Sequence, residues 1–462
     1  MRRWEGEART KDGGECAGAE LGHGARHRRA IHCEGGFSFV LRPSSFVRAV
    51  YWQNSRRSGL RGKHAQLSEQ RDQADNGEDA IGFPSPADRS RPDYESPDIL
   101  GRAREIGERI LGPHAEETDQ GAGPRRENFA ALASAGLLGL SVPREFGGLD
   151  APGSLQREVT EILASYCGVT TFTQAQHHGP CRMIAAAPSQ TLKGRLLPEM
   201  ASGRSLCAIS FAHLRRPGPA VLRADPVPGG YRLTGTAPWV TGWGLMNQVA
   251  FGATLPDGRF VYLWSPANRD QFPELFEGLA PPDGDWGTLI PSPPLKLCAM
   301  NASATSELKL EGWYIPSEHW LAESNAETLA RNDRNGVLGG TALPLGCTAG
   351  SLRALETVAE RRGIPAASRA LRSLSGEYED ARAQASDGIG RGANFFPRAL
   401  RIRAWCIDLA VRTAHAAVTA TSGSANSISN PAQRLFREAM FYTVQAQTRD
   451  VMDATLERLE RR

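Results

Sequence analysis

The sequence lacks any apolar run of about 18 residues, the length that a membrane-spanning helix needs. It also lacks an excess of either charge, because 54 Lys and Arg residues stand against 51 Asp and Glu residues, a formal net charge of +3. A surface this close to neutral favours neither nucleic acid nor a membrane as a partner, and we expect neither. The 462 residues, 40% of them hydrophobic, suffice for two or three domains with substantial cores.

Paired cysteine motifs are missing as well. The eight cysteines are scattered and form no C-x-x-C pair, so the common zinc and dithiol motifs are excluded. We expect reduced thiols, and therefore a cytoplasmic location. The adjacent His177 and His178 have no third ligand at a suitable spacing, so we predict core or surface histidines and no metal site.

Apolar periodicity is absent from residues 1–95, which are rich in Arg, Gly, Ser and His. Such a composition buries too little apolar surface to offset the entropy cost of ordering, so we predict a disordered or low-complexity extension. Residues 83–92 have the proline and serine content of a linker. A transit peptide and a basic nucleic-acid arm are alternatives. The acidic Glu5 and Glu7 count against the first, and the lack of interleaved aromatic residues counts against the second.

Residues 96–204 have the pattern of a helical domain. Apolar residues recur there at spacings of three and four, as in Ile99, Ala103, Ile106 and Ile110. Further helices are predicted in three stretches: residues 127–136, 155–166 and 190–200. No strand is expected in this block.

Residues 205–322 have the pattern of a β domain. Residues 225–230 form a turn-like cluster, and residues 255–258 are a short connection typical of a hairpin. Leu308 and Leu310 alternate with polar neighbours, as expected of a half-buried strand.

Residues 323–462 return to helical spacing. One apolar face is predicted from Ile402, Trp405, Cys406 and Leu409, and a second from Val451, Met452, Leu456 and Leu459. Helices, a β domain and a helical bundle, in that order, predict an α+β multidomain fold.

Four segments then carry a resemblance to a known family. Residues 136–148 run from an apolar helix end through Val142-Pro143 into a Gly147-Gly148 turn. The other three are Ser205-Leu-Cys-Ala-Ile-Ser210, Gly235-Thr-Ala-Pro-Trp-Val-Thr241 and Ser429-Asn-Pro-Ala-Gln-Arg-Leu-Phe-Arg-Glu-Ala439. In this order they resemble segments of acyl-CoA dehydrogenases, from about residue 98 to residue 459. The resemblance implies a helical N-terminal domain, a central β domain, a C-terminal four-helix bundle, bound FAD and a homodimer or homotetramer.

An isoalloxazine ring needs a flat apolar wall and a few hydrogen bonds. Trp239 offers the wall, and Thr241 offers a hydroxyl two residues along the same expected strand, hence on the same face. Ser210 offers a second hydroxyl. The resemblance implies these cofactor contacts: Ile209, Ser210, Trp239, Thr241, Gly423 and Thr448.

The expected catalytic base is missing. Dehydrogenation of an acyl thioester needs a carboxylate to take the α-proton while a hydride passes to the flavin. In most of the family this Glu lies near the C-terminus, where the present sequence has Ala446. Some members carry the base on an earlier helix, for which Asp333 is the nearest candidate. Arg215 and Arg216 replace a small turn of the family pattern and are either an anion contact or an exposed basic turn.

Three functions therefore remain open. The first is a FAD-dependent oxidoreductase acting on the CH–CH group of an acyl thioester, such as an acyl-CoA, or of a similar small molecule. The second is a reduced-flavin monooxygenase of the same architecture, which needs no C-terminal Glu. The third is a non-catalytic flavin-binding or assembly protein.

Overall fold

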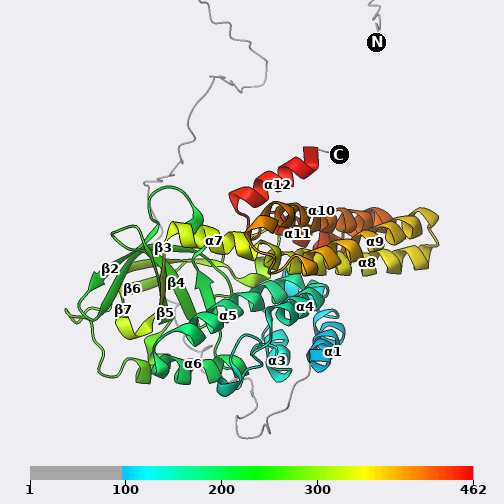
Figure 1. The fold of residues 1–462 in the computed structure, drawn as a ribbon. Coiled ribbons are helices and arrows are strands. Elements are labelled where there is room, and N and C mark those ends of the chain that lie inside the picture. The colour runs from blue at the N-terminus through cyan, green and yellow to red at the C-terminus, as the bar shows by residue number, and fades with distance from the viewer. Residues whose placement is uncertain (1–95, 461–462) are drawn as a thin grey trace, which may run out of the picture. The chain divides into compact units, whose positions relative to one another are not determined.

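The computed structural model describes residues 96–460, which all lie in the second of two units of the chain, Asp79–Arg462. The predictions for residues 1–95 lie outside the described residues. The described chain begins with helices, continues with strands and ends with helices (Figure 1). The predicted α+β fold is confirmed in this element order. The domain boundaries themselves stay predictions.

Six helices form the N-terminal region, and no strand interrupts them. A short π-helical turn, Gly107–Leu111, follows the first of them. The helices are α1 (Ser96–Ile106), α2 (Ala115–Gln120), α3 (Arg126–Ser134), α4 (Gly153–Ala164), α5 (Gly168–Ala186) and α6 (Gln190–Ser202). The helical spacing predicted the buried face of α1, where Ile99 and Ala103 are buried.

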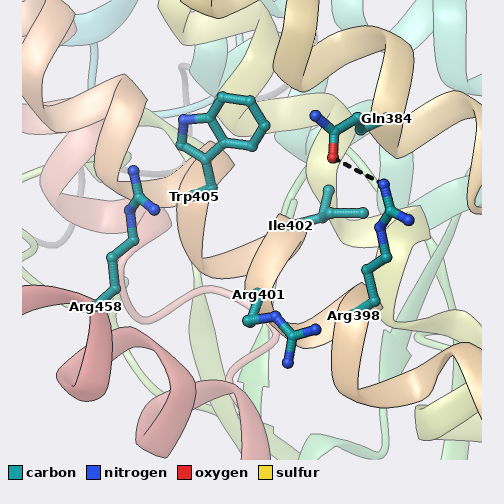
Figure 2. Close-up of a pocket in the computed structure, with 6 residues that line it drawn as sticks. All are labelled: Gln384, Arg398, Arg401, Ile402, Trp405 and Arg458. Carbon is teal, nitrogen blue, oxygen red and sulfur yellow. Dashed lines mark hydrogen bonds between the residues drawn. The ribbon is translucent and has the colours of Figure 1, made fainter.

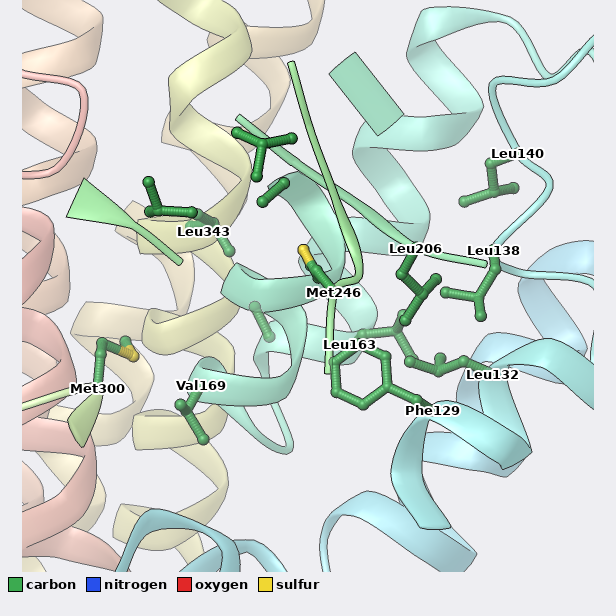
Figure 3. Packing of buried hydrophobic residues seen from close by; sticks show 14 of the residues in the cluster. Phe129, Leu132, Leu138, Leu140, Leu163, Val169, Leu206, Met246, Met300 and Leu343 are labelled. Carbon is green, nitrogen blue, oxygen red and sulfur yellow. The ribbon is translucent and has the colours of Figure 1, made fainter. Parts of the chain in front are cut away.

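The core joins these helices to the sheet. Phe129, Leu132, Leu138 and Leu163 from the helical region and Leu206, next to the first strand, belong to one buried cluster (Figure 3). Burying a leucine side chain contributes about 1.5–3 kcal/mol, so this cluster fixes the helices against the β region.

The β region is one eight-stranded sheet with the strand order β6-β7-β3-β2-β4-β5-β8, in which β1 pairs with β4. β1 and β4 run parallel, and most of the other neighbours run antiparallel. The strands are β1 (Cys207–Ser210), β2 (Leu222–Val227), β3 (Gly230–Val240), β4 (Gln248–Thr254), β5 (Phe260–Pro266), β6 (Thr288–Pro291), β7 (Ser306–Pro316) and β8 (Trp320–Ser324).

The predicted hairpin connection and the predicted turn have different outcomes. The connection at residues 255–258 does join two antiparallel strands, β4 and β5. The turn predicted over residues 225–230 is shorter, because Asp225, Pro226 and Val227 belong to β2 and pair with β3. Proline is tolerated there because a strand position that donates no ladder hydrogen bond does not need the N–H.

Six helices form the C-terminal region: α7 (Ala326–Gly336), α8 (Ala342–Arg362), α9 (Pro365–Asp387), α10 (Phe396–Thr421), α11 (Pro431–Tyr442) and α12 (Arg449–Glu460). α10 packs against α8, α9, α11 and α12 (Figure 1). Ile402, Cys406 and Leu409 are buried in its predicted apolar face. The face predicted for α12 is wrong in part, because Leu456 and Leu459 are about half exposed.

Buried ion pairs tie α11 to α2 across 318 residues of sequence. The Arg434 guanidinium donates to Glu116 at 3.0 Å and to Glu438 at 2.7 Å. Arg437 pairs with Asp119 in the same way. Burial raises the pKa of the Glu438 carboxyl, although Arg434 acts in the opposite direction. The segment that resembles the family motif on α11 therefore serves here as an anchor for the N-terminal helices.

The six cysteines of the described residues form no disulfide with one another. Five are buried and Cys298 is exposed. Among residues 96–460, no helix is long and apolar enough to cross a membrane, and no cluster of His, Cys, Asp or Glu side chains is suited to a metal ion.

Candidate active site

A cavity of about 1180 Å³ lies between the N-terminal helices and the start of the C-terminal region. One wall comes from the loop before α4, from α4 and from α5. The opposite wall comes from the end of α7, the start of α8, the loop after α9, the start of α10 and Gln445. The volume suits a small-molecule ligand, because such pockets usually enclose a few hundred to about 1,000 Å³.

The cavity lining is rich in arginine. Arg157, Arg182, Arg334 and Arg391 line it, and Asp150 is the one carboxylate among the described residues that does. Arg391 pairs with Asp387, outside the lining. Arg182 donates to the Ser141 hydroxyl and the Gln156 amide oxygen, which leaves its charge without a carboxylate partner among the described residues. The electrostatic environment therefore favours an anionic ligand.

Three lining residues present polar atoms that no other group satisfies. Nε and Nη1 of the buried Arg157 have no hydrogen-bond partner, although Nη1 lies 3.9 Å from Glu161 Oε2, and Nδ1 of the buried His178 has no partner either. The Gln445 amide oxygen is unsatisfied as well. Because unpaired buried polar groups cost about 1–3 kcal/mol each, such groups around a cavity indicate ligand contacts.

His178 is neutral at physiological pH, because burial lowers its imidazole pKa well below the usual value, with a further contribution from His177. His177 itself is a core residue, as one reading of the pair predicted. Its Nδ1 accepts from the Cys207 backbone N–H at 3.2 Å, and its Nε2 lies 3.2 Å from the Met200 carbonyl. No sequence pattern separates these two adjacent histidines, since only the fold places His178 and not His177 in the cavity lining.

The predicted flavin contacts on the strands lie close together. The Ser210 hydroxyl at the end of β1 donates to the Pro238 carbonyl at 3.4 Å, next to Trp239 on β3. Trp239 is 45% exposed, whereas Thr241 is buried. The expectation that the two share one strand face is wrong, because a bulge between Ala237 and Val240 breaks the alternation and β3 ends before Thr241.

Trp239 has a backbone φ of 59°, in the left-handed region that bulky residues rarely occupy. Thr241 begins a chain of buried hydroxyls: its Oγ1 lies 3.1 Å from Thr305 Oγ1, which lies 2.8 Å from Ser303 Oγ. Three hydroxyls have three protons for two hydrogen bonds. Thr241 can therefore donate outward while the chain stays intact.

The C-terminal residues of the predicted site are spread apart. Ala446 lies in the loop between α11 and α12, is exposed, has a φ of 49° and does not line the cavity, although its neighbour Gln445 does. The Thr448 hydroxyl accepts from the Val451 backbone N–H at the start of α12. Gly423 is exposed in a short 3-10 helix after α10, with open space around its α-carbon.

Asp333 is already paired. Both its carboxylate oxygens accept hydrogen bonds from Arg215, each at 2.8 Å. Arg215 follows β1 and Asp333 lies in α7, so the pair links the sheet to the C-terminal helices. Arg215 and Arg216 are both exposed at the turn after β1, as the interpretation of an exposed basic turn expects, and a contact to a bound anion stays a prediction.

Part of the sequence is similar to acyl-CoA dehydrogenases. Residues 95–204 match the N-terminal domain of acyl-CoA dehydrogenases. The chain is also 26% identical over 198 residues to the mitochondrial very long-chain specific acyl-CoA dehydrogenase of Macaca fascicularis, covering 42% of this chain and 29% of that protein. The mitochondrial isovaleryl-CoA dehydrogenase of Solanum tuberosum is 27% identical over 137 residues, covering 28% of this chain and 33% of that one. The chain thus spans about 30% of the length of these relatives.

Solved structures agree on the fold. Butyryl-CoA dehydrogenase from Megasphaera elsdenii superposes with a TM-score of 0.66 at 20% identity, covering 80% of this chain and 100% of that one. Dibenzothiophene monooxygenase from Paenibacillus sp. A11-2 gives 0.63 at 16% identity, covering 79% and 97%. The chain has the acyl-CoA dehydrogenase fold, and its N-terminal region matches the N-terminal domain of that family.

The residues of this acyl-CoA dehydrogenase-like chain fit a flavin on the sheet side. The exposed Trp239 ring and the spare proton of the Thr241 hydroxyl chain meet the needs of an isoalloxazine ring. The C-terminal side fits less well within a single copy, because Gly423 follows the far end of α10. Gln445 lies at the other end of this helix, where its carbonyl accepts a hydrogen bond from Arg403 Nη2. About 27 Å of helix separate Arg403 from Thr421, which directly precedes the turn that contains Gly423.

Proposed function

We propose that this chain is a flavin-dependent oxidoreductase whose small-molecule substrate binds in the 1180 Å³ cavity. The observation that carries the proposal is Trp239, a large aromatic residue that is both exposed and held in a left-handed backbone conformation. Such a conformation costs about 1–2 kcal/mol, and strain of this kind collects at ligand-binding sites. A bound flavin would supply the two-electron acceptor, and its ring would lie against this indole.

Thr241 is the residue that we expect to donate a hydrogen bond to the ring. Replacing Thr241 with Val removes the hydroxyl and keeps the shape, so the flavin spectrum should shift or flavin binding should weaken. Ser303→Ala is the matched control, because it removes the far end of the same hydroxyl chain and leaves Thr241 able to donate. Equal flavin content and identical visible spectra for Thr241→Val and the parent would contradict the assignment.

The substrate that we favour is an acyl thioester such as an acyl-CoA. The arginines of the cavity wall complement a ligand that carries phosphate groups, and Arg157 and His178 offer unsatisfied hydrogen-bonding atoms. This choice rests also on what the relatives are named for, the dehydrogenation of acyl-CoA compounds.

A dehydrogenase needs a base, and three positions are candidates. Asp333 is occupied by Arg215, and Ala446 has no ionisable group. Asp150, which lines the cavity and has a φ of 46°, is the third candidate, and no sequence motif marks it. Asp150→Asn should abolish dehydrogenation of butyryl-CoA and leave flavin content unchanged. Full activity in this variant would remove Asp150 and leave Asp333→Asn as the next test.

Ala446→Glu tests the position at which most acyl-CoA dehydrogenases carry their catalytic Glu. If the loop of Ala446 reaches the substrate, a new carboxylate there should raise butyryl-CoA dehydrogenation above the level of the parent protein. The matched control is Gln447→Glu, one residue along the same loop and also exposed. An equal rate in both variants would show that residue 446 lies outside the reaction site.

Monooxygenation with reduced flavin is the second candidate. The specific observation in its favour is the scarcity of carboxylates in the cavity, where a proton-abstracting base is required only for dehydrogenation. In addition, a protein named as a dibenzothiophene monooxygenase has the same fold as this chain.

A homo-oligomer is part of the proposal. Because Gly423 lies beyond the far end of α10 from Gln445, it could contact the cofactor only from a second copy of the chain. Light scattering of the purified protein measures its oligomeric state directly. If the protein is a monomer, Gly423 is not a cofactor contact.

A visible spectrum of the purified protein distinguishes the three functions. Bound oxidised flavin that butyryl-CoA bleaches supports dehydrogenation. Consumption of oxygen with added reduced flavin, and no bleaching, supports the monooxygenase. A protein that neither carries nor binds FAD would support the non-catalytic alternative and overturn the proposal.

A further inference from the structure

A second pocket shares no lining residue with the large cavity and plays no part in the proposed function. It encloses about 350 Å³ between α9, α10 and α12 (Figure 2). Gln384, Arg398, Arg401, Ile402, Trp405 and Arg458 line it. We call it the arginine pocket, since three of the six side chains are guanidinium groups.

The charge of the arginine pocket is not compensated on the α10 side. Arg398 contacts uncharged groups, the Gln384 amide oxygen at 3.4 Å and the Phe395 ring. Arg401 is exposed, and neither arginine forms an ion pair with any described residue. Arg458 differs, because it donates to Asp408 at 2.9 Å and lies 3.9 Å from Glu377, which also binds Arg412 and the Trp405 indole.

The position of these cations on α10 is unfavourable. Arg398 and Arg401 lie in the first two turns of a 26-residue helix whose first turn has no acidic residue. The positive end of the helix dipole repels cations there, at a cost of a few tenths of a kcal/mol to about 1 kcal/mol each. The buried Arg403, on the next turn of the same helix, adds a third positive charge nearby.

A bound anion would remove this repulsion. Guanidinium groups match phosphate oxygens with two parallel hydrogen bonds, and Ile402 and Trp405 offer an apolar wall beside them. We propose that the arginine pocket binds a phosphate group between Arg398 and Arg401, either as a free anion or as part of a small organic phosphate.

The test uses the full chain at low salt, with isothermal titration calorimetry and thermal unfolding. Pyrophosphate and ADP are the probes. Each should bind saturably and raise the melting temperature of the parent protein. Arg398→Gln and Arg401→Gln should each weaken binding about ten-fold or more, and the double variant should lose the ligand-induced rise. Tighter binding of ADP than of pyrophosphate would identify an organic phosphate as the ligand, and the reverse would identify the free anion.

The matched control is Arg372→Gln, since Arg372 is an exposed arginine on α9 outside the pocket. Without ligand, the double variant should melt at the same temperature as the parent or higher, because the dipole repulsion is gone. A lower melting temperature without ligand would mean that the arginines serve stability. That result, equal weakening by Arg372→Gln, or no saturable binding of either probe would overturn the proposal.

Discussion

The two halves of the predicted cofactor site differ in how the chain holds them. On the sheet side, Ser210, Trp239 and Thr241 lie near one another, fixed by backbone pairing and short hydroxyl contacts. On the C-terminal side, Ala446 and Gly423 lie near opposite ends of α10, held by helices that are anchored elsewhere. Predicted site residues on paired strands lie close together in the fold, whereas those at the two ends of a long helix lie far apart. Within one copy of the chain, only the sheet side therefore has its predicted cofactor contacts close to one another.

The anchor of the C-terminal side gives the largest expected effect. Arg434→Leu removes the partner of a buried carboxylate, Glu438, and should lower the free energy of unfolding by about 3–5 kcal/mol. Urea unfolding measures this. The double variant Arg434→Met/Glu438→Gln should recover most of the loss, because it leaves no uncompensated charge in the core. A single variant as stable as the parent would show that α11 does not depend on this pair.

The anchor of the sheet side is sensitive to pH. Burial lowers the pKa of His177 to about 4, against an ordinary value near 6.5. Between these values the unfolded chain binds more protons than the folded chain, so stability is complete above pH 6.5 and falls as the pH drops toward 4. His177 should account for about 2 kcal/mol of the loss between pH 7 and pH 5.

Unfolding of a His177→Gln variant at several pH values checks this contribution. The variant should show a smaller decline than the parent over that interval. An unchanged decline in His177→Gln would assign the pH dependence to other groups, such as His213 or His319, whose pKa values burial also lowers to about 4.

The strain at Trp239 should appear as a preference for glycine. Trp239→Gly and Trp239→Ala both remove the indole, but only alanine keeps a β-carbon at a φ of 59°. The glycine variant should therefore be more stable by about 1 kcal/mol, the reverse of the order in ordinary strands. Both variants should lose flavin. If alanine were the more stable, the left-handed conformation would not be a feature of the folded protein.

The smallest effect is expected on α12. Leu456→Gln and Leu459→Gln should each change the free energy of unfolding by less than about 0.5 kcal/mol, because both side chains are about half exposed. Val451→Gln, on the same helix but buried, is the control and should cost more. A large loss in either leucine variant would mean that this surface is covered, as a second copy of the chain would cover it.

Local patterns predicted the elements well, because their causes are local. Alternation of Leu308 and Leu310 indicates a half-buried strand, and β7 has that burial pattern. The bulge before Thr241 could not be predicted, since one inserted residue reverses the side-chain alternation and leaves no mark in composition. Leu456 has the helical spacing of a buried residue but is 51% exposed, and the spacing alone does not tell which part of a helix the fold covers.

Long-range features required the fold. The cavity brings Asp150 and His178 together with Gln445, which lies 267 residues after His178 in the sequence. Nothing near Asp333 in the sequence shows that Arg215 occupies it. The motif on α11 can be recognised in the sequence, but its ion-pair partners Glu116 and Asp119 cannot. They lie 318 residues away, and no regular spacing in the sequence marks residues that far apart as a pair.

The burial of the cysteines gives the protein a set of internal reporters. Burial raises the pKa of the Cys406 thiol to about 12, and it raises the pKa values of Cys167, Cys181, Cys207 and Cys347 as well. A thiol reagent at pH 8 should therefore modify Cys298 quickly in a variant without Cys16 and Cys33. The five others should react only as fast as their surroundings open, so the order of labelling would separate local opening of α5, β1, α8 and α10 from global unfolding.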